Sequence, residues 1–126
     1  MSVLVDTSVW VNHFRNSDAA LVDLLLSDRV LTHPLILLEI ACGTPPAPRG
    51  NTLAALGRLQ PANQASFDEV AAFIEREQLF GLGCGAVDIS LLASTLITPG
   101  ATLWTADKRL LALCQRFDIA YQPGLH

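Results

Sequence analysis

Short apolar runs alternate along the chain with segments whose apolar residues recur at helical spacing. The run that begins at Ser2 and is closed by Asp6 is β-branched and apolar on both faces, as is typical of a strand buried in a parallel sheet. Residues 29–32 and 102–105 predict two further strands, and residues 118–122 suit an edge strand at the end of the chain. Strands interleaved with helices predict an α/β fold, a three-layer α/β/α sandwich around a central parallel sheet.

Two of the expected helices carry distinct start signals. Pro34 suits the first turn of a helix, and Ser66 with Glu69 has the S-x-x-E form of a capping box. Five other helices are expected. The first begins at Thr7 or Ser8, the second includes Leu21–Leu25 behind Ser17 or Asp18 as its cap, and the third includes Leu53–Leu59. The fourth runs from about Val87 to Ile97, and the last begins at Asp107. The proline-rich residues 44–50 predict a loop that is too short to separate domains. We therefore expect a single domain over residues 1–126.

The apolar runs are too short to cross a membrane. No run approaches the ~20 apolar residues that a bilayer requires, and Asp6 and Asn12 interrupt the N-terminal stretch. The three cysteines, Cys42, Cys84 and Cys114, cannot all pair, and none has the C-x-x-C spacing of a zinc or redox site. We expect a cytoplasmic protein without a signal peptide, with these cysteines reduced and in the core.

Four acidic residues recur where a strand and helix chain would bring them to one edge of the sheet. Asp6 closes the first strand, Asp107 follows the strand of residues 102–105, Asp88 starts a helix, and Glu39 lies within the third helix. In open α/β sheets, ligands bind outside the carboxyl ends of the strands. Four carboxylates at that place predict a divalent metal site.

Glu39 gives the metal hypothesis its strongest support from the residues alone. Its helix is apolar nearly all round, because Ile36, Leu37 and Ile40 occupy the other sides, so we expect the carboxylate to be buried. A buried, unpaired carboxylate costs several kcal/mol or becomes neutral, and a metal ion relieves that cost. Oxygen ligands without matching His or Cys favour Mg²⁺ or Mn²⁺ over zinc.

Simpler roles are open for each of these residues. Asp6, Asp88 and Asp107 each suit a helix N-cap, and Glu39 could form an ion pair with Arg15 or Arg29. It is the conjunction of four acids that favours the metal site.

Other polar and aromatic residues give less support for a functional site. The hydroxyls of Ser8 and Thr105 are expected to hydrogen-bond to the acids, with plain turn caps as the alternative. Lys108 and Arg109 either hold a substrate phosphate or are simply solvated. The histidines lack ligand spacing and the tryptophans suit the core; these residues are His13, His33, His126, Trp10 and Trp104.

The net charge of −4 does not exclude a nucleic acid as substrate. A phosphate backbone ordinarily selects a basic surface. Of the 12 acidic residues, the four at the suspected site leave 8, against 8 Lys and Arg. The rest of the molecule is therefore neutral.

The ordered motifs around the four acids resemble those of a PIN domain, and most closely the VapC-type toxins of bacterial toxin-antitoxin pairs. The resemblance covers nearly the whole chain and rests on Val5-Asp6-Thr7-Ser8-Val9-Trp10, Leu37-Leu38-Glu39-Ile40-Ala41, Ala86-Val87-Asp88 and Thr105-Ala106-Asp107. It implies that Asp6, Glu39, Asp88 and Asp107 are the metal-binding and catalytic acids, with Ser8 and Thr105 as polar neighbours.

The same resemblance implies an activity and partners. It implies a Mg²⁺-dependent endoribonuclease, with Mn²⁺ as a possible substitute, that hydrolyses RNA to a 3′-hydroxyl and a 5′-phosphate. It also implies a homodimer and a cognate antitoxin whose C-terminal segment occupies the acidic groove.

Three other readings are open at this point. A haloacid-dehalogenase-like phosphatase also has a strand that ends in Asp, but it needs a second Asp where this chain has Ser8. A response-regulator receiver needs a phosphoacceptor Asp after its third strand, and no good candidate lies there. The third is a PIN-like module that binds partner proteins without catalysis.

Overall fold

A four-stranded parallel sheet forms the centre of the computed structural model, which describes residues 1–124. Its strands are β1 (Ser2–Val5), β2 (Val30–Thr32), β3 (Gln60–Pro61) and β4 (Ala101–Trp104), in the order β3-β2-β1-β4. Val3 of β1 lies opposite Val30 of β2 on one side and Thr102 of β4 on the other. Val3, Leu4 and Val5 are fully buried, which explains why the run is apolar on both faces.

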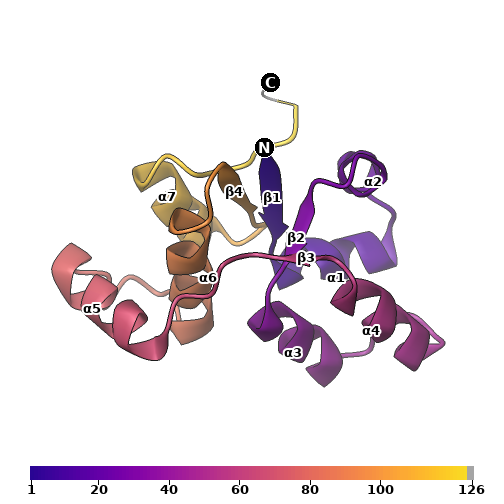
Figure 1. Ribbon diagram of the computed structural model, residues 1–126, viewed down its shortest axis with the longest axis horizontal. Coiled ribbons are helices and arrows are strands. Elements are labelled where there is room, and N and C mark those ends of the chain that lie inside the picture. The colour runs from indigo at the N-terminus through magenta and orange to yellow at the C-terminus, as the bar shows by residue number, and fades with distance from the viewer. Residues whose placement is uncertain (125–126) are drawn as a thin grey trace.

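Helices cover both faces of this sheet. They are α1 (Thr7–Arg15), α2 (Ala19–Leu26), α3 (Pro34–Cys42), α4 (Arg49–Gly57), α5 (Phe67–Glu77), α6 (Ala86–Leu96) and α7 (Lys108–Arg116). Figure 1 shows α1 to α4 on one side of the strands and α5 to α7 on the other. The predicted three-layer α/β/α sandwich is confirmed.

The strand order explains this division and locates the candidate site. The chain moves from β1 through β2 to β3, and then returns across the sheet to β4 on the far side of β1. Because parallel connections are right-handed, the reversal places the later helices on the opposite face. The carboxyl ends of β1 and β4 therefore flank the point where the chain direction diverges, which is where open α/β sheets bind ligands.

Several helix starts agree with the sequence signals. Ser66 Oγ accepts a hydrogen bond from Glu69 N (3.1 Å), and Glu69 Oε1 accepts one from Ser66 N (2.8 Å), which completes the predicted capping box of α5. Asp18 Oδ1 accepts from Leu21 N (3.1 Å) at the start of α2, and Pro34 occupies the first turn of α3. These starts fix the helices that connect the strands.

The core lies on both faces of the sheet and contains both tryptophans, as predicted. Trp10 is 3% and Trp104 7% exposed. The predicted burial of the cysteines is correct only in part, because Cys114 is buried, Cys84 is half-buried and Cys42 is exposed at the end of α3. All three are free thiols.

The region between β2 and α5 departs from the prediction. Residues 49 and 50, expected in a loop, form the first turn of α4, where Arg49 Nη2 donates to Ala41 O (2.7 Å) and ties α4 to α3. Helix α4 ends at Gly57, so Leu59 lies beyond it. The two-residue strand β3 was not predicted, since a strand that short, ending in Pro61, has no periodic pattern.

The end of the described chain also differs from the prediction. In place of an edge strand over residues 118–122, one bridge pairs Leu103 with Ala120. Leu103 N donates to Ile119 O (2.8 Å), and Tyr121 N donates to Leu103 O (3.0 Å). After α7 the chain thus returns alongside β4. Within residues 1–124, no helix is long and apolar enough to cross a membrane.

Candidate active site

Asp6 lies at the buried floor of the site, directly after β1. Its side chain is 5% exposed, and its backbone N–H donates to Trp104 O (2.9 Å), which extends the pairing of β1 with β4. Asp6 Oδ2 accepts hydrogen bonds from Ser8 Oγ (2.6 Å) and Thr105 Oγ1 (2.9 Å). Asp6 also occupies the N-cap position of α1, but its side chain makes no capping hydrogen bond. A cap role therefore does not explain this carboxylate.

The two hydroxyls connect segments that are almost one hundred residues apart in the chain. Ser8 Oγ accepts from Ala106 N (3.0 Å), Thr105 Oγ1 accepts from Asp107 N (3.1 Å), and the two hydroxyl oxygens lie 3.4 Å apart. The hydrogen bonds that the sequence analysis expected from Ser8 and Thr105 are present. They join the turn after β1 to the turn after β4.

Asp107 lies on the exposed rim and serves as the N-cap of α7. Its Oδ1 accepts hydrogen bonds from Arg109 N (2.8 Å) and Leu110 N (3.0 Å). The simple capping role is thus real for Asp107. Capping uses only Oδ1 of Asp107, since Oδ2 receives no hydrogen bond from the described part of the chain.

Glu39 is exposed, so the prediction that it is buried was wrong. Only one side of α3 packs on the core, through Ile36 and Ile40, whereas Leu38 on another side is 61% exposed. An all-round apolar helix therefore did not guarantee burial of its acidic residue. Glu39 Oε1 accepts a hydrogen bond from Thr7 Oγ1 (2.6 Å), which ties α3 to the start of α1.

The alternative ion pair of Glu39 is not formed. Neither Arg15 nor Arg29 forms a salt bridge with Glu39 in residues 1–124, and Arg29 Nε donates instead to Met1 O (3.2 Å). The hydroxyl of Thr7 is the side-chain partner that Glu39 has there. Thr7 had been considered only as a helix start, because its contact with Glu39 depends on the packing of two helices.

Asp88 is half-buried in the first turn of α6, on the opposite face of the sheet from Glu39. Burial raises the pKa of Asp88, and the charges of Asp6, Asp107 and Glu39 raise it further. A hydrogen bond with the Gly85 backbone has the opposite effect and lowers the pKa. All three other acids therefore act on Asp88. The fold brings the four predicted acids from four segments into one electrostatic environment.

The donor chemistry of this cluster fits a hard divalent cation. Asp6, Glu39 and Asp107 each use one carboxylate oxygen for hydrogen bonds to the protein, and no hydrogen bond from residues 1–124 reaches the other oxygen. Mg²⁺ and Mn²⁺ prefer such oxygen ligands. No three acidic, His or Cys side chains in this range already form a closed ligand set, and Mg²⁺ usually keeps several waters and binds through one or two carboxylates.

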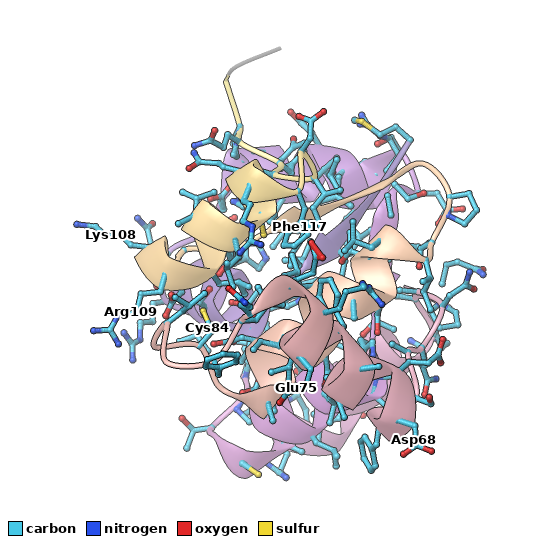
Figure 2. The ribbon with its side chains drawn as sticks, turned by 90° about the vertical axis from the view of Figure 1, so that its left-hand side faces the viewer. Asp68, Glu75, Cys84, Lys108, Arg109 and Phe117 are labelled. Carbon is cyan, nitrogen blue, oxygen red and sulfur yellow. The ribbon has the colours of Figure 1, made fainter. Side chains whose placement is uncertain are left out.

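The remaining candidates have structural or peripheral positions. His13 Nδ1 accepts a hydrogen bond from Asp18 N (3.0 Å), and His33 is buried at the N-cap of α3, where burial lowers its pKa. His126 lies outside the described residues. Lys108 and Arg109 are exposed in the first turn of α7, and of the two it is Arg109 that lies near Cys84 (Figure 2). Burial raises the pKa of the Cys84 thiol, as do the charges of Asp88 and Asp107, which disfavours a thiolate at the site.

Comparison with known proteins identifies the family to which this architecture belongs. The PIN-domain family model matches residues 3–115, a span that contains all four acids. This chain belongs to the PIN-domain family. It is 44% identical over 118 residues to ribonuclease VapC32 of two strains of Mycobacterium tuberculosis, CDC 1551 / Oshkosh and ATCC 25618 / H37Rv, with 94% of each chain covered. The similarity places it among the VapC-type PIN domains and confirms the resemblance drawn from the motifs.

Proposed function

We propose that this PIN domain is a metal-dependent endoribonuclease that hydrolyses RNA phosphodiester bonds and acts as the toxin of a toxin-antitoxin pair. The observation that carries the proposal is the clustering of four carboxylates at the point where the strand order diverges. The 44% identity to ribonuclease VapC32 supports RNA as the substrate class. Membership of the PIN family also argues against the phosphatase and receiver readings.

Asp6, Glu39, Asp88 and Asp107 are proposed to hold Mg²⁺, for which Mn²⁺ can substitute. When bound, such a cation activates a water for in-line attack on phosphorus and stabilises the leaving oxygen. Hydrolysis of this kind needs no nucleophilic side chain and leaves a 3′-hydroxyl and a 5′-phosphate. A 2′,3′-cyclic phosphate product would contradict the mechanism.

The protein's own contribution is to orient the carboxylates. Ser8 and Thr105 both donate to Asp6 Oδ2, which fixes the orientation of this buried carboxylate and directs its other oxygen away from them. Thr7 does the same for Glu39 at the exposed side of the cluster. Because four carboxylates repel a phosphodiester, a cation held by them would also make the local charge favourable for RNA.

The partners follow from the same acidic cluster and from the family. We propose a cognate antitoxin that presents a basic segment, with an Arg, to the acidic groove, since opposite charges give such an interface its specificity. We also propose a homodimer, a cytoplasmic location and a single PIN-like domain over residues 1–126. Failure of the neighbouring gene product to inhibit cleavage would count against the antitoxin.

The experiment that tests the activity is cleavage of total bacterial RNA by the purified, partner-free protein. We expect discrete fragments with Mg²⁺, none with a chelator, and a loss of about 10²- to 10³-fold in Asp6→Asn, since charge stabilisation of the transition state is removed. Intact RNA with ample Mg²⁺ and Mn²⁺ would instead favour a PIN-like module that only binds partners. The fragment ends would identify the cleaved RNA.

A further inference from the structure

The side chain of Arg109 lies directly against the backbone of Gly83, in the loop before α6. A Cβ atom at Gly83 would lie 2.7 Å from Arg109 Cδ and Nη1 and 2.9 Å from Nε, closer than any carbon contact allows. Gly83 also has a φ of +84°, a conformation that other residues rarely adopt. Glycine at this position is therefore what permits the guanidinium to rest on the loop.

This packing leaves the donors of the guanidinium available. Within the described residues, the guanidinium of Arg109 forms no salt bridge and no hydrogen bond, and the bond to Asp107 Oδ1 comes from the backbone N–H. Its neighbour Lys108 makes no comparable contact and extends away from the molecule, whereas Arg109 lies lower, near the loop that leads to Cys84 (Figure 2). Of the two cations, Arg109 is the one whose side chain lies against the glycine loop.

Arg109 also lies at the rim of the acidic cluster. Its positive charge acts on the Cys84 thiol, on which the charges of Asp88 and Asp107 act as well. The charges that act on Asp88 itself are those of the other acids. Arg109 is thus close to the cluster without serving as the counter-ion of Asp88.

We propose that Arg109, positioned by Gly83, binds a phosphate of the RNA next to the one that is cleaved. A guanidinium presents paired N–H donors that match two phosphate oxygens. The loop backbone lies against this side chain before RNA arrives and excludes some of the conformations that would otherwise be lost on binding. This inference rests on the proposed ribonuclease function and adds one substrate-binding residue, Arg109, and one positioning residue, Gly83.

The first test has two measurements. The Kd of a short single-stranded RNA is measured with Ca²⁺ in place of Mg²⁺, to keep the RNA intact, and the KM and kcat of cleavage are measured with Mg²⁺. Arg109→Ala should raise Kd and KM by roughly tenfold, as expected for a lost charge-assisted hydrogen bond, and leave kcat nearly unchanged. The slope of log Kd against log salt should fall by about 0.7 to 1. Arg109→Lys should recover part of the affinity. Lys108→Ala is the matched control and should leave Kd, KM and the salt slope unchanged.

A pair of glycine variants tests the positioning role. Gly81→Ala and Gly83→Ala both force alanine into a positive φ (+73° and +84°), but only the Cβ at Gly83 meets Arg109, because nothing lies within 4 Å of the one at Gly81. Gly83→Ala should therefore weaken RNA binding more than Gly81→Ala. On the Arg109→Ala background, the two glycine variants should have equal effects.

The outcomes separate this inference from the function on which it rests. If the wild-type protein cleaves RNA and Arg109→Ala keeps wild-type Kd, KM and salt slope, the role of Arg109 is overturned and the nuclease stands. If the wild-type protein neither binds nor cleaves RNA, both fail. Equal effects of the two glycine variants in the wild-type background would remove Gly83 as the positioning residue.

Discussion

The two acids at the strand ends and the two acids on helices are held in different ways. Asp6 and Asp107 follow neighbouring strands and are linked through Thr105, which donates to Asp6 Oδ2 and accepts from Asp107 N. Glu39 and Asp88 come from helices α3 and α6, in different layers of the sandwich. Their positions depend on how those helices pack on the sheet.

This difference indicates that the two pairs of acids are positioned with different firmness. The strand-end half is fixed by backbone pairing between β1 and β4 and by two hydroxyls, so its geometry is set before any ligand binds. The helix-borne half has the hydrogen bond from Thr7 to the exposed Glu39 and the hydrogen bond between the half-buried Asp88 and the Gly85 backbone at the start of the same helix. The strand-end acids are therefore the more firmly positioned pair.

Of the changes that test this comparison, removal of the Thr105 hydroxyl is expected to have the largest effect on RNA cleavage. Thr105→Val keeps the shape of the side chain but removes its hydrogen bond to the buried Asp6, and should lower RNA cleavage by about 10- to 100-fold. Thr7→Val removes the exposed bond to Glu39 and should cost about threefold or less. Thr105→Ser is the control that retains a hydroxyl. Equal losses in the two valine variants would abolish the distinction between the halves.

The second prediction concerns the repulsion between the acids. Mg²⁺ should raise the free energy of unfolding, measured with urea, by about 2.7 kcal/mol at one hundred times its Kd. Asp88→Asn should reduce this gain and should itself stabilise the metal-free protein at pH 7. Asp23→Asn makes the same chemical change on an exposed residue of α2 and should leave the response to Mg²⁺ unaltered.

The pH dependence of the Asp88→Asn effect has a definite sign. Because the folded protein raises the pKa of Asp88, the unfolded chain loses that proton at lower pH. The fold is therefore destabilised as the pH rises above the ordinary value of 3.8, and the penalty persists at neutral pH. The stabilisation by Asp88→Asn should disappear below that value. A benefit that stays constant down to acidic pH would contradict this account.

The smallest effect concerns the cap of the helix that carries Glu39. His33 is 4% exposed, its Nδ1 accepts from Leu35 N (3.1 Å) and its Nε2 lies 3.1 Å from Ser94 Oγ. Burial lowers the pKa of His33, so as the pH falls below 6.5 the unfolded chain takes up the proton first and stability is lost. His33→Asn keeps a capping acceptor and should flatten this dependence between pH 7 and 5. His33→Ala should cost about 1 kcal/mol at pH 7.

Sequence reasoning succeeded where one local rule determines the outcome. The run before Asp6, the capping box of Ser66 and the start of α3 at Pro34 each depend on a few consecutive residues, and each was predicted. The approach of Asp6 to Asp107 followed from a general rule, since parallel strands bring their carboxyl ends to one edge.

It failed where position depends on which side of a helix faces the core. The apolar residues around Glu39 suggested burial, but α3 lies at the surface and leaves Leu38 and Glu39 exposed. The contacts of Thr7 with Glu39 and of Gly83 with Arg109 join segments that carry no shared pattern. Such contacts are set by the packing of whole elements.

The return of the chain alongside β4 determines how this molecule can meet another protein. An open sheet edge offers unpaired backbone groups to any passing strand and invites aggregation. Here the β4 edge is occupied at Leu103 by the segment around Ala120, and the opposite edge is a two-residue strand that ends in Pro61, which has no N–H to donate. Along residues 1–124 neither border of the sheet offers a run of free backbone groups. Side chains on the helices and loops are therefore the main surface that this fold offers to a protein partner.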